Sequence, residues 1–181
     1  MRQLRRSVIV VGLTLLVSLC LPAGAGATAS RFPTAPKTHR DSSGACLVSG
    51  GTQGYPLGNR PLLVGAHPTG VAVVWLPGLN ATTCKATVTV GTSKVADDLA
   101  LDIDQAPLAN PGVVCPNDDG SAAVLYVTFK IAPTEMIHIS LDGCGWITMR
   151  GTAGRMKTAQ LASNLLPLAP PMWRTYLVLA T

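Results

Sequence analysis

Apolar and polar residues alternate along two neighbouring segments in the second half of the chain. Within residues 122–131 and 135–141 one face of each segment is apolar, formed by Leu125, Val127, Phe129 and Ile131 and by Ile137, Ile139 and Leu141. A period of two is typical of β-strands that bury one face. The short connection Ala132-Pro133-Thr134 between them therefore predicts a β-hairpin.

A third strand extends this hairpin to a meander. A turn centred on Pro133 brings the apolar faces together in the pairs Phe129–Ile137 and Val127–Ile139. Asp142-Gly143 is a second hairpin-turn signal, and the segment GWITMR follows it. The pattern predicts an antiparallel meander over residues 123–149.

Two further strands are expected in the first half. The continuous apolar run from Val71 to Leu76 lies between glycines, which favours a strand buried on both faces. After Cys84, alternation continues with one apolar face (Ala86, Val88 and Val90) and one threonine face (Thr87 and Thr89).

Helical spacing appears in two places. Val95, Leu99, Ile103 and Ala106 recur at helical intervals, with Ser93 expected to cap the first turn and Pro107 to end the helix. Asp98 and Asp102 are expected on its solvated face. The segment MKTAQLASNLL before Pro167 predicts a second helix with Ala162 and either Leu165 or Leu166 inside, whereas residues 175–180 suggest an edge strand or an apolar tail. The predicted fold class is α+β, with two helices on one face of an antiparallel sheet.

The N-terminus has the features of a secretory signal peptide at residues 1–29. Three arginines precede an apolar run from Val8 to Leu21, and small residues follow, so that cleavage after Ala25, Ala27 or Ala29 fits equally well. A retained membrane anchor and a lipoprotein modified at Cys20 are the alternatives; Leu19 is too large for the latter. We expect a secreted or envelope-associated protein that meets the membrane only during export.

Removal of this leader changes the charge of the chain. The formal charge of +5 falls to +2 with the three arginines, and from Asp41 onward eight Lys and Arg face nine Asp and Glu. Nucleic-acid binding is therefore not expected, because no basic stripe remains to neutralise phosphates. The Pro-, Ser- and Thr-containing residues 30–43 predict a disordered tail, and residues 44–181 a single disulfide-stabilised domain.

Four cysteines remain in the exported part, which predicts two disulfides. Three pairings are possible, and we favour Cys46–Cys84 with Cys115–Cys144, since the second would tie the entry of the meander to its last strand. No Cys-x-x-Cys pair is present, so a zinc site is not expected, and no motif indicates a cofactor.

The stretch CPNDDG at residues 115–120 predicts a tight turn, since Asx side chains bond to nearby backbone and Gly accepts positive φ. Calcium binding is the alternative, but the run lacks alternating oxygen ligands and a distant glutamate. This stretch, the apolar β-segment and Gly143-Cys144 resemble a group of secreted actinobacterial proteins of unknown function. The resemblance covers about 30 residues, departs at Ala132-Pro133-Thr134, where those proteins often have Asp-Gly, and implies an exported disulfide-bonded domain.

A second resemblance is to bacterial subtilisin-inhibitor proteins, which are small exported α+β domains with two disulfides. Their reactive loop begins just after a cysteine in a stretch similar to Val113-Val114-Cys115-Pro116. The resemblance implies an inhibitory loop at Pro116, Asn117 and Asp118, although Asn117 is a poor anchor for a protease pocket and the Cys46–Cys84 spacing is longer than in that family.

Catalytic candidates are few. The predicted register places His138 beside Thr128 and diagonal to Tyr126 and Lys130, which forms a polar surface patch where His138 could act as a base with Tyr126 as its partner. An exposed strand histidine with ordinary neighbours is the simpler interpretation. Since no nucleophile elbow, phosphate loop or zinc-protease motif is present, we expect a non-enzymatic binding or structural protein with an extracellular protein or cell-wall partner. A protease inhibitor and a small secreted hydrolase are the alternatives.

Overall fold

The computed structural model describes residues 36–49, 63–109, 119–149 and 154–178, all of which belong to one compact unit spanning residues 32–181. The elements are β1 (Thr38–Arg40), β2 (Cys46–Val48), η1 (Val64–Ala66), β3 (Pro68–Leu76), β4 (Thr87–Gly91), α1 (Ser93–Gln105), β5 (Ala122–Phe129), β6 (Glu135–Ser140), β7 (Trp146–Met149), β8 (Arg155–Met156), α2 (Ala159–Leu165), η2 (Leu166–Leu168) and α3 (Pro171–Val178). The fold class is α+β, as predicted.

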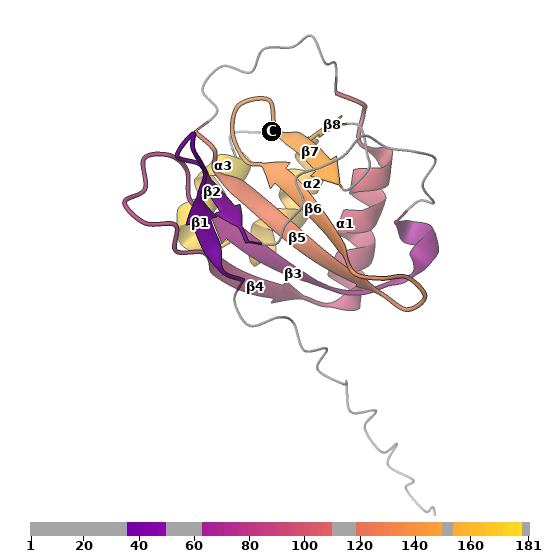
Figure 1. Cartoon of the computed structure of the whole chain (residues 1–181). Helices are drawn as coiled ribbons and strands as arrows, with labels where there is room; N and C mark the ends of the chain where they lie inside the picture. Colours follow the sequence, from indigo (N-terminus) through magenta and orange to yellow (C-terminus); the bar gives the residue numbers. More distant parts are fainter. Residues whose placement is uncertain (1–35, 50–62, 110–118, 150–153, 179–181) are drawn as a thin grey trace, which may run out of the picture. The chain divides into compact units, whose positions relative to one another are not determined.

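A six-stranded antiparallel sheet in the order β4-β3-β5-β6-β7-β8 forms the middle layer (Figure 1). The helices lie behind it in this view, and the β1–β2 hairpin lies in front. The sheet is larger than predicted, since β8 was not expected, and three α-helices are present in the described part of the chain where two were predicted.

Both faces of the sheet are apolar, which explains the continuous apolar run of β3. Val71, Val73 and Trp75 belong to the main core beneath the helices. Val74 and Leu76 belong to a smaller core with Cys46 and Val48 of the hairpin. Successive strand residues point to opposite faces, so a strand covered on both sides needs apolar side chains at every position.

The Cys46–Cys84 disulfide joins the hairpin to the segment before β4, which confirms the first predicted pairing. Cys144 is also disulfide-bonded. Its predicted partner Cys115 lies outside the described residues, so the second pairing stays a prediction.

The hairpin also corrects the predicted tail. Residues 30–43 were expected to be disordered, yet Thr38–Arg40 forms β1, paired with Cys46–Val48. The hydroxyl of Thr38 donates to the backbone oxygen of Cys84 at 2.6 Å. The composition of the segment gave no sign of this, because the short hairpin is held by contacts with distant residues such as Cys84.

The register of the meander differs from the prediction, although its faces do not. Leu125, rather than Phe129, opposes Ile137, and Val127 opposes Glu135. The turn is thus centred on Ile131, whose side chain is 69% exposed. A shift of the turn centre by two residues keeps every side chain on its original face, so the apolar pattern is satisfied equally by both registers.

The residue that caps helix α1 is Thr92, one position before the predicted Ser93. Thr92, with an extended backbone, accepts the hydrogen bond from the Val95 amide, while Ser93 is the first helical residue. Asp102 was expected on the solvated face but is 8% exposed, because α2 packs there and the Asn164 amide donates to its carboxylate at 2.7 Å. Burial raises the pKa of Asp102, partly offset by this hydrogen bond.

The C-terminal segment forms α3 rather than an edge strand or an apolar tail. Pro171 is its first residue, a position where the missing amide proton costs nothing. Trp173 and Leu177, four residues apart, are buried against the main core. In α2, Leu161, Ala162 and Leu165 are buried, which agrees with the predicted inner face.

Candidate functional site

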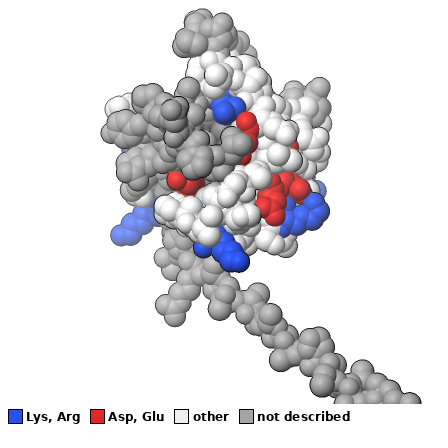
Figure 2. Space-filling model, turned by 90° about the vertical axis from the view of Figure 1, so that its right-hand side faces the viewer, with Lys and Arg blue, Asp and Glu red and all other residues white. Residues whose placement is uncertain are grey.

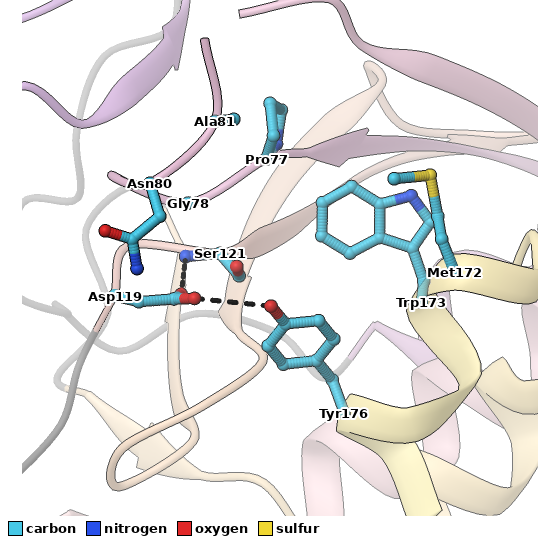
Figure 3. Close-up of a pocket in the computed structure, with 9 residues that line it drawn as sticks. All are labelled: Pro77, Gly78, Asn80, Ala81, Asp119, Ser121, Met172, Trp173 and Tyr176. Carbon is cyan, nitrogen blue, oxygen red and sulfur yellow. Dashed lines mark hydrogen bonds between the residues drawn. The ribbon is translucent and has the colours of Figure 1, made fainter.

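A pocket of about 170 Å³ lies where three segments meet at one end of the sheet. The loop after β3, the turn before β5 and helix α3 line it (Figure 3). The described lining residues are Pro77, Gly78, Asn80, Ala81, Asp119, Ser121, Met172, Trp173 and Tyr176.

Trp173 forms one wall of this pocket and is held by the sheet. Its ring stacks on that of Trp75, with ring centroids 6.2 Å apart and an interplanar angle of 29°. Trp75 in turn donates its indole N–H to the hydroxyl of Thr89 at 2.8 Å. The stack therefore fixes α3 on the strand whose following loop forms the opposite wall.

Asp119 is the charged residue among the described lining residues, and several hydrogen bonds position it. Its Oδ1 accepts from the Ser121 amide at 2.8 Å, and its Oδ2 accepts from the Tyr176 hydroxyl at 3.3 Å (Figure 3). Its own amide donates to Oδ2 of Asp142 at 2.6 Å. Gly120 adopts a φ of 75°, a left-handed conformation that suits glycine and turns the chain into β5.

Gly78 allows the loop after β3 to approach Asp119 closely. The Leu79 amide donates to the backbone oxygen of Asp119 at 2.5 Å. A Cβ at Gly78 would lie 2.6 Å from both the backbone oxygen and Oδ1 of Asp119. A residue without a side chain is therefore required at position 78 for this wall of the pocket to form.

Arg40 supports the same loop from the hairpin side. Its guanidinium donates to the backbone oxygen of Ala81, and also to that of Gly44 at 2.5 Å. Strand β1, predicted to be disordered, therefore helps to hold the rim of the pocket.

Two buried polar atoms in the lining have no hydrogen-bond partner in the part of the chain that the structure describes: Oγ of Ser121 and Nε1 of Trp173. The two residues are 1% and 4% exposed. The Ser121 hydroxyl lies near enough to lower the pKa of Asp119, but without hydrogen-bond geometry. Buried polar groups are nearly always paired, so both atoms are suited to bind water or a ligand in the pocket.

The pKa of Asp119 is set by opposing effects. Burial raises it, but hydrogen bonds with the side chain of Asp142, with Ser121 and with Tyr176 lower it below its ordinary value. Asp119 is therefore ionised at neutral pH and places a negative charge beside the aromatic wall.

Lys157 lies near enough to Asp142 to feel its charge. Burial lowers the pKa of Lys157, and the charge of Asp142 opposes this effect. Its Nζ donates to the backbone oxygen of Leu141 at 2.6 Å. The ammonium group is thus engaged by the turn after β6 and is not among the pocket-lining residues.

The predicted inhibitory loop, Pro116, Asn117 and Asp118, lies outside the described residues. Asp119, the next residue of the same turn, is at the pocket. The turn chemistry predicted for residues 115–120 is visible in its described end, at Asp119 and Gly120.

The structure separates the predicted surface patch of Tyr126, Thr128, Lys130 and His138. His138 opposes Val124 and Thr148 rather than Thr128, and only Tyr126 remains diagonal to it. Thr128 donates to the backbone oxygen of Gly70 at 3.1 Å, and Lys130 lies past the end of β5.

The face of the sheet that carries this patch is also less exposed than predicted. Tyr126 packs against the smaller core beneath the hairpin, and burial raises its pKa.

The pocket itself was not predicted. No role was predicted for residues 77–81 or for Trp173, and Tyr176 belonged to residues 175–180, which were expected to form an edge strand or an apolar tail. One signal was present: Pro171 followed by an aromatic pair three residues apart is typical of a helix that shows both rings on one face.

Charged side chains of both signs are intermixed on the face shown in Figure 2. Within the described ranges, no group of three His, Cys, Asp or Glu residues is placed to hold a metal ion, and no helix is long and apolar enough to cross a bilayer. Comparisons with protein-family models, with curated proteins and with solved structures found no match.

Proposed function

We propose that this chain is an exported, non-enzymatic binding protein that holds a small polar group in the pocket between the loop after β3 and helix α3. The basic and apolar leader pattern at residues 1–29 supports export. The Cys46–Cys84 disulfide supports maturation in an oxidising compartment.

One observation carries the binding role: Nε1 of Trp173 and Oγ of Ser121 are buried in the pocket lining without a hydrogen-bond partner among the described residues. Leaving a buried donor unsatisfied costs about 1–3 kcal/mol. A ligand or an ordered water that bonds to either atom recovers part of that free energy, whereas an empty apolar pocket offers no such gain.

The chemistry of the lining favours binding over catalysis. A general base works best with a pKa near the operating pH, and that of Asp119 is held below its ordinary value. The described lining residues include no His, Cys or Lys that could activate the Ser121 hydroxyl.

The indole N–H resonance of Trp173 provides the test. In ¹H–¹⁵N spectra of the exported protein, titration with a set of small neutral, cationic and anionic molecules should shift this signal. Trp146, outside the lining, is the internal control. Substitution Ser121→Ala should weaken binding about tenfold, the equivalent of one hydrogen bond to a buried group.

Two results would contradict the proposal. If no molecule in the set shifts the Trp173 signal selectively, the pocket is not a binding site. If a bound molecule is converted to a product at a rate that Ser121→Ala abolishes, the protein is an enzyme instead.

A further inference from the structure

We infer that this pocket selects a protonated amine on a short apolar stem, an inference that rests on the proposed function. Three features of the pocket support it: the charge of the lining, the nature of its walls and its size.

The charge comes from a single position. Among the described lining residues Asp119 is the one that carries a charge, and the others are neutral. The Tyr176 hydroxyl, the Ser121 amide and the Asp142 side chain hydrogen-bond to Asp119, and a carboxylate offers about four acceptor sites in total. Asp119 therefore has acceptor capacity left for an ammonium group.

The Ser121 hydroxyl adds a second acceptor at the same end. It is buried, close to the Asp119 carboxylate and without a hydrogen-bond partner in the described structure. Figure 3 shows the Ser121 and Asp119 oxygens at one end of the pocket, facing Tyr176. An ammonium group has three donors and no acceptor, so it suits these two oxygens better than a carboxylate or a phosphate does, and the indole N–H of Trp173 is left to bind water.

The opposite wall is aromatic and apolar. The rings of Trp173 and Tyr176 have centroids 5.8 Å apart and are tilted by 39°. Met172, which is 69% exposed, lies at the rim, and Pro77 lines the facing loop. Aromatic faces attract cations, and the apolar side chains suit a hydrocarbon stem.

The size of the pocket limits the ligand. A volume of about 170 Å³ corresponds to about six water molecules at about 30 Å³ each. Pockets for drug-sized ligands begin at about 300 Å³. The pocket thus accommodates a group the size of one amino-acid side chain rather than a whole cofactor.

Lys157 is the positively charged residue that could compete with a bound ammonium group for the charge of Asp119. Its Nζ is bonded to the Leu141 backbone oxygen, and its charge acts on Asp142, the partner of the Asp119 amide. Lys157 does not line the pocket, so it leaves Asp119 as the charge that a ligand meets.

The experiment compares three probes of similar shape: n-butylammonium, n-butanol and butyrate. Wild-type protein should bind n-butylammonium at least tenfold more tightly than either of the others, as measured by the Trp173 indole shift. Asp119→Asn should reduce that preference to less than threefold. Asp97→Asn, the same change on an exposed position of α1, should leave it unchanged.

A further probe distinguishes the two sources of such an amine. If the natural ligand is a lysine side chain of a protein or peptide, N-acetyl-lysine methylamide should bind more tightly than n-butylammonium, because its amide groups reach the rim. Weaker or equal binding indicates a free amine.

The outcomes separate this inference from the proposed function. Preferential binding of butanol or butyrate by the wild type would overturn the inference while the proposed binding role stands. Absence of any Trp173 shift with all probes would overturn both. The comparison uses wild-type protein, so it stays decisive if Asp119→Asn does not fold.

Discussion

The hydroxyl of Tyr176 donates a hydrogen bond to the carboxylate of Asp119 at 3.3 Å, across 57 residues of sequence. This contact joins the C-terminal helix to the turn that precedes β5. It links the stability of α3 to the charge state of the pocket.

Substitution Tyr176→Phe should lower the free energy of unfolding by about 1 kcal/mol, because it removes one hydrogen bond to a partly buried acceptor. Chemical denaturation at neutral pH measures the change. Tyr126→Phe, on the opposite face of the sheet, is the matched control and should cost less than about 0.5 kcal/mol. Equal costs for the two variants would show that the Tyr176 contact does not stabilise the fold.

The loss of stability at acidic pH should depend on Asp119. Its folded pKa lies below the ordinary value of 3.8, so the stability it contributes is present above that value and is lost as the pH falls through the folded pKa. Asp119→Asn should therefore lose less stability than the wild type between about pH 4 and pH 2. Thermal unfolding across this range measures the loss of stability. An equal loss in the variant and the wild type would show that Asp119 does not contribute to it.

Asp102 should show the opposite sign. Burial raises its folded pKa above 3.8, so its ionised form costs stability at neutral pH, and the cost disappears as the pH falls through the folded pKa toward 3.8. Asp102→Asn, which keeps an acceptor for Asn164, should be more stable than the wild type at pH 7 and lose that advantage below about pH 4. Asp97→Asn, on the exposed side of α1, should show no such crossover.

Gly78→Ala should destabilise the protein by about 1–3 kcal/mol, the usual cost of overpacking. The new Cβ would meet the backbone oxygen of Asp119 at 2.6 Å, and backbone cannot move aside at low cost. Gly65→Ala is the control, because a Cβ there meets nothing within 4 Å. Denaturation of both variants tests the close approach, and similar stability for the two would contradict it.

Loss of the Cys46–Cys84 disulfide, with a sequence separation of 38, should cost about 4 kcal/mol in the chain-entropy account. The double substitution to serine should also raise amide hydrogen exchange in β1 and β2, since the disulfide is the covalent link between the hairpin and the segment before β4. Exchange in the main core should change less. A uniform rise across all strands would show that the hairpin does not unfold separately.

The strands of the meander illustrate what period-two patterning can and cannot decide. It placed Leu125, Val127, Ile137 and Ile139 on one face, and all four are in the main core. It could not choose between turn centres two residues apart, because both keep these faces intact. In the observed register β5 also pairs with β3, where Leu125 opposes Val73. No local pattern in the sequence indicates this long-range pairing.

Local sequence patterns could not predict the pocket, for a related reason. Its lining comes from residues 77–81, 119–121 and 172–176, which are brought together only when β3, β5 and α3 pack around one core. Turn chemistry indicated the bend at Asp119, but not what faces it.

By itself, the sequence determined the α+β class and the buried faces of the central strands, because periodicity and residue type act locally, and it favoured the first disulfide among three possible pairings. Only the tertiary structure decided the strand register, the burial of Asp102 and the meeting of Asp119 with Trp173 and Tyr176. These features depend on contacts between segments far apart in the chain, whose free energies are gained only when the whole core is assembled.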